Sequence, residues 1–299
     1  MKIELCVDEA EAGMRFDSFI ALKAGDMSRS QAARLIEAGA AEPERKNSYH
    51  VQAGEHYSLD IPEPEECAAE PEDIPLDILY EDDQVIVVNK PKGMVVHPDN
   101  VHHRGTLVNA LLFHCHDLSG IGGVLRPGIV HRIDMDTTGS VIACKTDLAH
   151  ESISAQLKEH NMGRKYIAIV CGHLKEKEGM IDAPIGRNEK DRKKMAVNYK
   201  NGKEAVTYYR VLKEFRDYSY IECRLKTGRT HQIRVHMAYI GHPLLGDRVY
   251  GHNDKISIRL EGQCLHAKEL SFVHPVSGER IETDAPIPEY FESLLQKLP

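Results

Sequence analysis

The chain lacks the long hydrophobic runs that mark membrane proteins. No stretch of 18 or more apolar residues occurs among its 299 residues, so we expect no transmembrane helix. The N-terminus has no basic segment followed by an apolar one, so we expect no signal peptide. The length suits one large domain or two ordinary domains, either of which can bury a full core.

Paired cysteines are also missing. The seven cysteines are scattered along the chain, and none forms a Cys-x-x-Cys pair. An odd number of unpaired cysteines favours a reduced, cytoplasmic protein in which most thiols are buried as small apolar groups.

Motifs that bind metals or nucleotide phosphates are absent as well. Several histidines cluster in sequence without zinc-ligand spacing: His97, His102, His103, His114 and His116. Histidines that face solvent or RNA fit this pattern better than a metal site does. The segment 89–93, Asn-Lys-Pro-Lys-Gly, lacks the glycine spacing of a Walker loop. We therefore expect no metal. A metal-dependent hydrolase remains an alternative, which bound metal and loss of activity to a chelator would favour.

The net charge of −8 hides an uneven distribution. Residues 1–83 contain 21 acidic and 7 basic residues, whereas residues 84–299 contain 25 acidic and 31 basic residues. Within the basic part, the run from Arg187 to Lys203 holds seven basic residues, including Lys193 and Lys194, and two acidic ones. Such a run suits contacts with phosphates, although a solvated surface loop would have a similar composition.

The composition divides the chain into three segments. Residues 1–62 form a small α+β domain, with expected helices over 15–23 and 29–38 and a strand over 57–61. Residues 63–77 are rich in proline and acidic residues, so we expect an extended, mobile linker. Residues 78–299 form the larger domain.

The larger domain is rich in predicted strands. Residues 85–88, 141–143, 166–170, 206–211 and 218–223 have the β-branched and aromatic content of strands. Helices are expected over 106–115, 147–160 and 231–241. Because strands and helices do not alternate regularly, we predict an α+β fold with a mixed, largely antiparallel sheet and flanking helices.

Two motifs carry the chemistry. The first, His-Arg-Ile-Asp-Met-Asp-Thr-Thr-Gly over 131–139, places Asp134 beside basic residues in a turn-forming run. The second, Thr-Gly-Arg-Thr-His-Gln-Ile-Arg-Val-His over 227–236, supplies Arg234, which shares a helix face with His231. An arginine beside an aspartate lowers the carboxyl pKa by about 1–3 units and fixes its orientation. Together the motifs suggest an Asp–Arg site that acts on a polyanion, although Asp134 alone could simply cap a turn.

These motifs resemble those of the RluA/RluD-type RNA pseudouridine synthases. Two further matches, Arg-Lys-Tyr-Ile-Ala-Ile-Val-Cys-Gly over 164–172 and Asn-Lys-Pro-Lys-Gly-Met-Val-Val-His-Pro over 89–98, occur in the order that the family has. The resemblance runs from about residue 79 to about residue 289.

The resemblance implies roles for individual residues. Asp134 would be the central catalytic residue, as nucleophile or base, with Arg234 paired to it. Tyr166 would lie against the target base and help to remove the ring-carbon proton; stacking on such a ring contributes about 1–3 kcal/mol per base. Arg132 would occupy the space that the extruded base leaves. Arg229 and His231 would contact the RNA, with a phosphate contact expected for Arg229.

The first domain resembles the S-four-type RNA-binding domain. The phrases Arg-Phe-Asp-Ser-Phe over 15–19 and Ser-Arg-Ser over 28–30 carry this resemblance. The hairpin that normally follows the second helix is replaced by the sequence of residues 41–46. This leaves Arg29 and Arg34, with Arg45 and Lys46, as the expected RNA contacts.

The expected activity is isomerisation of specific uridines to pseudouridine in structured RNA, with large-subunit ribosomal RNA as the expected substrate. The base is neither lost nor reduced, so we expect no cofactor and no metal. The expected partner is RNA, and a monomer is the default state. The alternative from another class is a catalytically silent RNA-binding protein that assists ribosome assembly. It would need the charges but not the complete set Asp134, Tyr166 and Arg234.

Overall fold

The computed structural model describes residues 2–24, 27, 29–60, 69–99, 101–116, 118–121, 127–189, 191, 194–251 and 260–299, with the backbone alone for 30, 31 and 34. The chain divides into two compact units, residues 1–66 and residues 67–299. No helix in the described part of the chain is long and apolar enough to cross a bilayer.

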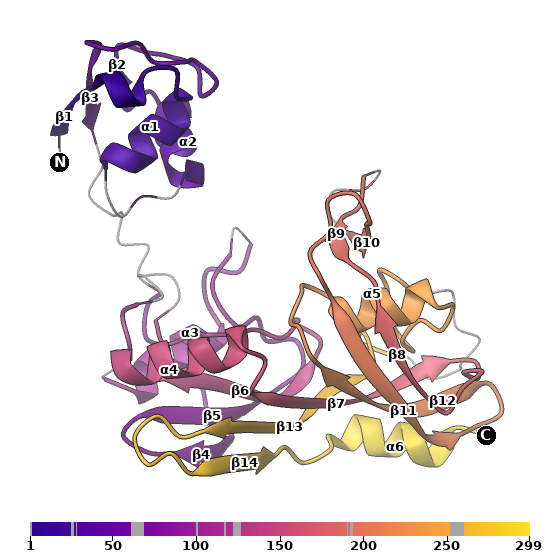
Figure 1. Cartoon of the computed structure of the whole chain (residues 1–299). Helices are drawn as coiled ribbons and strands as arrows, with labels where there is room; N and C mark the ends of the chain where they lie inside the picture. Colours follow the sequence, from indigo (N-terminus) through magenta and orange to yellow (C-terminus); the bar gives the residue numbers. More distant parts are fainter. Residues whose placement is uncertain are drawn as a thin grey trace. The chain divides into compact units, whose positions relative to one another are not determined.

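The first unit packs two helices against a small antiparallel sheet (Figure 1). Its core gathers Phe16, Phe19, Ile20, Tyr57 and Leu59, all fully buried. The expected helices and strand are confirmed to within about one residue, but the first strand was not predicted. The elements are β1 (Lys2–Cys6), η1 (Glu9–Glu11), α1 (Phe16–Lys23), α2 (Arg29–Glu37), β2 (Ala41–Glu42) and β3 (His56–Asp60), with strand order β1-β3-β2.

Part of the predicted linker belongs to the larger unit. Residues 69–77 form neither helix nor strand, but Glu70 and Glu72 are bound to the segment 104–109. Asn109 Nδ2 donates to Glu70 O at 2.8 Å, and Glu72 N donates to Asn109 O at 3.0 Å. Arg104 also pairs with the carboxylates of both glutamates. A cation and backbone hydrogen bonds thus offset the charge repulsion that the acidic composition suggested. Residues 63–68 of the predicted linker lie outside the described part.

The larger unit is built on one nine-stranded sheet. Every strand pairing in it is antiparallel except that between β6 and β13. The predicted α+β class with a largely antiparallel sheet is therefore confirmed. The strands are β4 (Ile78–Glu81), β5 (Val85–Lys90), β6 (Thr138–Cys144), β7 (Gly163–Cys171), β8 (Glu178–Asp182), β11 (Val206–Glu214), β12 (Tyr218–Leu225), β13 (Leu265–Val273) and β14 (Arg280–Asp284). Their order is β4-β5-β6-β13-β7-β12-β11-β8, with β14 also on β13.

Helices cover both faces of β5 and β6. The unit's helices are α3 (Leu107–His114), α4 (Asp147–Lys158), α5 (Gln232–Tyr239) and α6 (Glu289–Lys297). Ile86 and Val88 pack with α3, whereas Val85 and Val87 pack with α4. Because both faces are buried, the sequences of these strands are continuous apolar runs without alternating polar residues.

A short hairpin, β9 (Ile185–Arg187) and β10 (Met195–Val197), stands apart from the large sheet (Figure 1). It carries part of the basic run that the sequence singled out. Four of the six described cysteines are buried.

Candidate active site

Asp134 lies on the loop that enters β6, and the buried side chain of Lys90 anchors this loop. Lys90 Nζ donates to three backbone carbonyl oxygens, those of Pro91, Met94 and Met135, at 2.8, 2.8 and 2.9 Å. Burial lowers the pKa of Lys90 to about 7. Since each N–H of the ammonium group has an acceptor, the motif over 89–98 holds the Asp134 loop in place.

The sheet places Tyr166 near this loop. Ala267 of β13 pairs with Gly139 of β6 on one side and with Tyr166 of β7 on the other. Neighbouring strands lie about 4.8 Å apart, so Tyr166 and the start of β6 are about 10 Å apart across the sheet. Gly139 has φ +108°, and a Cβ there would lie 2.3 Å from Ala267 O. The glycine that ends the first motif therefore permits this close strand pairing.

Arg234 links Asp134 to a second carboxylate, Asp247. On α5, the Arg234 side chain donates from Nη1 to Asp134 Oδ2 at 2.9 Å. Its other nitrogens bind Asp247, with Nε to Oδ2 at 2.7 Å and Nη2 to Oδ1 at 3.0 Å. Asp247 Oδ1 also accepts the backbone N–H groups of Val249 and Tyr250. This two-point geometry fixes the guanidinium plane and so the direction in which Nη1 meets Asp134.

The charges of this Asp–Arg–Asp group support one another. Burial opposes the charge of Arg234, but the hydrogen bond and charge of Asp247, together with Asp134, offset it and keep the pKa of Arg234 above its ordinary value. Burial would also raise the pKa of Asp247, yet Arg234 and the two backbone N–H groups hold that pKa below its usual range. Arg234 and Asp247 are therefore both suited to be charged at neutral pH.

His231 faces the other oxygen of Asp134. Its Nε2 is 3.7 Å from Asp134 Oδ1, and its Nδ1 is 2.8 Å from the Tyr250 hydroxyl oxygen. That oxygen also accepts the backbone N–H of Met195 on β10, and the Tyr250 ring lies 5.2 Å from the Arg234 guanidinium carbon. Burial lowers the pKa of His231. A neutral imidazole thus lies beside Asp134, connected through Tyr250 to the basic hairpin.

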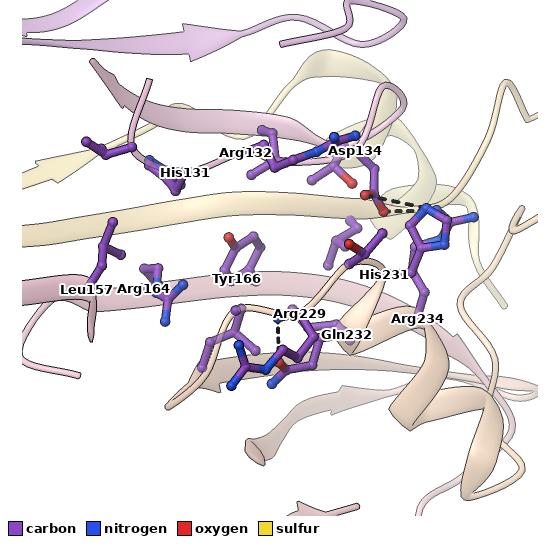
Figure 2. A pocket seen from close by; sticks show the side chains of 18 of the residues that line it. His131, Arg132, Asp134, Leu157, Arg164, Tyr166, Arg229, His231, Gln232 and Arg234 are labelled. Carbon is purple, nitrogen blue, oxygen red and sulfur yellow. Dashed lines mark hydrogen bonds and ion pairs between the residues drawn. The ribbon is translucent and has the colours of Figure 1, made fainter. Parts of the chain in front are cut away.

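One pocket of about 550 Å³ is lined by Asp134, His231 and Arg234 together with Tyr166 (Figure 2). The buried Tyr166 ring lies in the middle of it, with Asp134 and Arg234 toward one end and Arg164 and Leu157 toward the other. Burial raises the pKa of the Tyr166 hydroxyl, which Arg164 partly opposes. At neutral pH the resting form of Tyr166 is therefore the neutral phenol.

The structure brings six of the predicted site residues to this pocket. They are Arg132, Asp134, Tyr166, Arg229, His231 and Arg234. Arg132 is exposed at its edge. Arg229 Nε donates to Glu204 O at 2.8 Å, and its backbone N–H donates to the buried Gln232 side chain. Residues from three separate motifs thus converge on one cavity.

The remaining predicted contacts lie elsewhere. Lys194 precedes β10, outside the pocket lining, and its Nζ donates to Val249 O at 3.2 Å. Arg29, on α2 of the first unit, donates to Asp17 Oδ2 at 3.1 Å. Lys193 and the side chain of Arg34 lie outside the described residues.

The clustered histidines form no common centre within the described residues. His97 lines the pocket, whereas His114 lies with Glu81 and Cys115 in the one described group that has metal-ligand atoms close together. Lys145 Nζ lies 2.6 Å from a Glu81 oxygen, so a cation already neutralises that carboxylate.

Sequence reasoning missed Asp247 and Tyr250. Both follow α5 in a turn with no recognised motif, and they reach Arg234 only through the fold. It also missed Arg164, which precedes Tyr166 by two residues on β7 and therefore shares its face of the strand. The two-residue periodicity of a strand, counted back from Tyr166, would have pointed to Arg164.

Comparison with known proteins now defines the class. Residues 84–239 match the family described as RNA pseudouridylate synthase. The chain belongs to this family and is an isomerase that acts on RNA.

Its relatives narrow the class to the RluA/RluD type. The chain is 45% identical to a ribosomal large subunit pseudouridine synthase D from Zymomonas mobilis, over 99% of this chain and 97% of that protein. It is 48% identical to the uncharacterized RNA pseudouridine synthase YlyB of Bacillus subtilis, over 99% of this chain and 98% of that protein. The structure of human RNA pseudouridylate synthase domain containing 1 is similar with a TM-score of 0.58 and 28% identity, over 72% of this chain and 84% of that one.

Proposed function

We propose that this enzyme converts specific uridines of large-subunit ribosomal RNA to pseudouridine, with Asp134, Tyr166 and Arg234 as its catalytic residues. The observation that carries the proposal is the Asp134 carboxylate, held by the buried Arg234 in the same pocket as the Tyr166 hydroxyl. The ribosomal substrate is supported by relatives named as large-subunit pseudouridine synthase D.

The reaction breaks the bond from C1′ to N1 and forms one from C1′ to C5 of the same uracil. The C5 proton must then leave, and N1 gains a proton. Arg234 Nη1 holds Asp134 Oδ2, so we assign attack or proton transfer to the other oxygen, Oδ1. Because Tyr166 rests as a neutral phenol, it can take the C5 proton only while passing its own proton on.

RNA recognition would rest on two kinds of cation. Arg132, exposed at the pocket edge, would fill the space from which the target base is extruded. Arg229 and Lys194 would contact phosphates, as would Lys193, which lies outside the described residues. His231, which lines the pocket with its Nε2 at 3.7 Å from Asp134 Oδ1, would contact the RNA and help to position that carboxylate.

The N-terminal unit would act as an S-four-like RNA-binding domain, with residues 78–299 as the catalytic domain. Arg29 and Arg34 would contribute to its RNA surface. Arg15 and Arg29 both bind Asp17, whose pKa they lower to about 2, with the Arg15 hydrogen bond as the largest cause. Because Asp17 neutralises part of this charge, the unit should add selectivity more than affinity.

The proposal is tested by mapping pseudouridines in total RNA from cells with the protein, without it, and with an Asp134→Asn copy. We expect one or a few ribosomal RNA sites to disappear without the protein and to return only with the parent copy. An unchanged map in cells without the protein would reject the proposed substrate. Restoration by the Asp134→Asn copy would reject the assigned residue.

A further inference from the structure

Arg164 is a mostly buried cation for which the described residues supply no carboxylate. Its Nη2 donates to Lys226 O at 3.4 Å, and its Nε is buried without a hydrogen-bond partner. Burial lowers the pKa of Arg164; the charges that act on it are those of Tyr166, which raises that pKa, and of Arg229, which lowers it further. The guanidinium is thus desolvated without a compensating charge.

Two other cations near Arg164 both have carboxylate partners. Arg234, also in the pocket, binds the carboxylates of Asp134 and Asp247. Lys165, the next residue on β7, points to the opposite face of the strand and pairs with Glu269 and Glu222. A buried charge left without a partner is strongly destabilising. The cost at Arg164 is explained if an anion from outside the chain supplies the missing charge.

The surroundings of Arg164 leave room for its guanidinium. Gly228, in the motif that also carries Arg229, packs directly against it: a Cβ at position 228 would lie 2.4 Å from Arg164 Nη1. Arg164 and Tyr166 are two residues apart on β7, so their side chains share one face and are separated by about 6.6 Å along the strand. Figure 2 shows Arg164 beyond Tyr166, on the side away from Asp134.

We infer that Arg164 binds a backbone phosphate next to the target nucleotide, in a subsite of the pocket beyond Tyr166. This inference rests on the proposed function, because Tyr166 is taken to mark the position of the target base. The guanidinium would supply the positive charge and the N–H groups that face the pocket to the phosphate. The contact would fix the strand on one side of the target base.

The test compares Arg164→Met with the parent and with Arg104→Met. Arg104 is a control because it is an exposed arginine bound to Glu70 and Glu72, outside both cavities that Arg164 lines. The full-length proteins would be titrated with labelled pentauridine, all-phosphate or with one linkage at a time replaced by an uncharged methylphosphonate. We expect one methylphosphonate position to weaken parent binding by about 10–100-fold. Arg164→Met should bind the all-phosphate strand weaker by a similar factor and should be insensitive to that position.

Thermal unfolding separates phosphate binding from a purely structural role, because a structural role would lower the melting temperature of Arg164→Met. Without ligand, Arg164→Met should melt at the same temperature as the parent or higher, because methionine keeps the apolar stem and removes the unpaired charge. Inorganic phosphate, compared with chloride at equal ionic strength, should raise the melting temperature of the parent but not of Arg164→Met. Phosphate stabilisation without a methylphosphonate effect would assign the site to free phosphate and overturn the RNA subsite.

Further variants keep the inference testable if Arg164→Met folds poorly. Gly228→Ala should displace the guanidinium and reproduce the loss at the same methylphosphonate position, whereas Arg164→Lys should restore part of the affinity. A lower melting temperature with unchanged oligonucleotide binding would make Arg164 a structural residue. A parent that binds no oligonucleotide, or is insensitive to every methylphosphonate, would also overturn the subsite. These measurements need no turnover, so a phosphate contact could persist even if the pseudouridine map rejected the proposed function.

Discussion

Asp247→Asn should destabilise the larger unit more than any exposed carboxylate change. The Asp247 side chain is fully buried and accepts four hydrogen bonds, two from Arg234 and two from backbone N–H groups. Asparagine has the same shape but no charge, and its amide NH₂ would face a donor. Removing one partner of a buried ion pair costs about 3–5 kcal/mol. The residual pairing of Arg234 with Asp134 favours the lower part of this range.

The assay is thermal unfolding of the full-length protein followed at the transition of the larger unit, which spans residues 67–299. For a unit of this size, 1 kcal/mol corresponds to about 2–4 °C, so we expect a fall of about 6–20 °C. Asp284→Asn is the matched control: Asp284 is exposed and pairs with Lys268 at the surface. Its loss should cost less than about 1 kcal/mol. If Asp247→Asn has the same melting temperature as the control, Asp247 does not hold Arg234 in the way the geometry indicates.

Three further predictions concern the pocket. Tyr166→Phe should keep base stacking but lose most turnover, and a variant as fast as the parent would exclude proton transfer through the hydroxyl. Arg132→Ala should slow turnover of folded RNA far more than turnover of a short RNA whose target is already unstacked; equal losses would remove the base-extrusion role. Burial, with Arg164, lowers the pKa of His131 from 6.5 to about 3, so its ring is neutral in the fold but protonates in the unfolded chain below pH 6.5. The unfolded state binds more protons between about pH 3 and 6.5, so stability should fall as pH falls through that window. His131→Gln keeps an acceptor for the Ile142 N–H and should flatten this dependence in thermal unfolding; an unchanged slope would contradict it.

Much of the fold and part of the site could be predicted because their signals are local. The apolar strands around 85–88 and 141–143 and the helix that bears Arg234 show their character within a few residues. The family resemblance led us to expect that Asp134, Tyr166 and Arg234 lie together, and all three line one pocket. Asp247 could not be found this way, because its importance arises from a contact with Arg234 that only the fold creates.

Two expectations drawn from composition depend on contacts that the sequence does not show. Composition indicated repulsion within residues 63–77, but Glu70 and Glu72 are held by Arg104 and Asn109, which lie more than 30 residues away in sequence. A count of basic residues likewise does not reveal that Arg29 shares Asp17 with Arg15. Charge pairing depends on long-range contacts, so composition alone overestimates the free charge available to a ligand.

The most direct test of the central claim is turnover by Asp134→Asn at saturating enzyme, on an RNA that carries the site found by mapping. Asparagine keeps the shape of the side chain and a hydrogen-bond acceptor for Arg234 but removes the charge that attack or proton transfer requires. We expect no detectable pseudouridine, with RNA binding nearly unchanged. Substantial residual turnover would contradict the assignment of Asp134 as the residue on which the reaction depends.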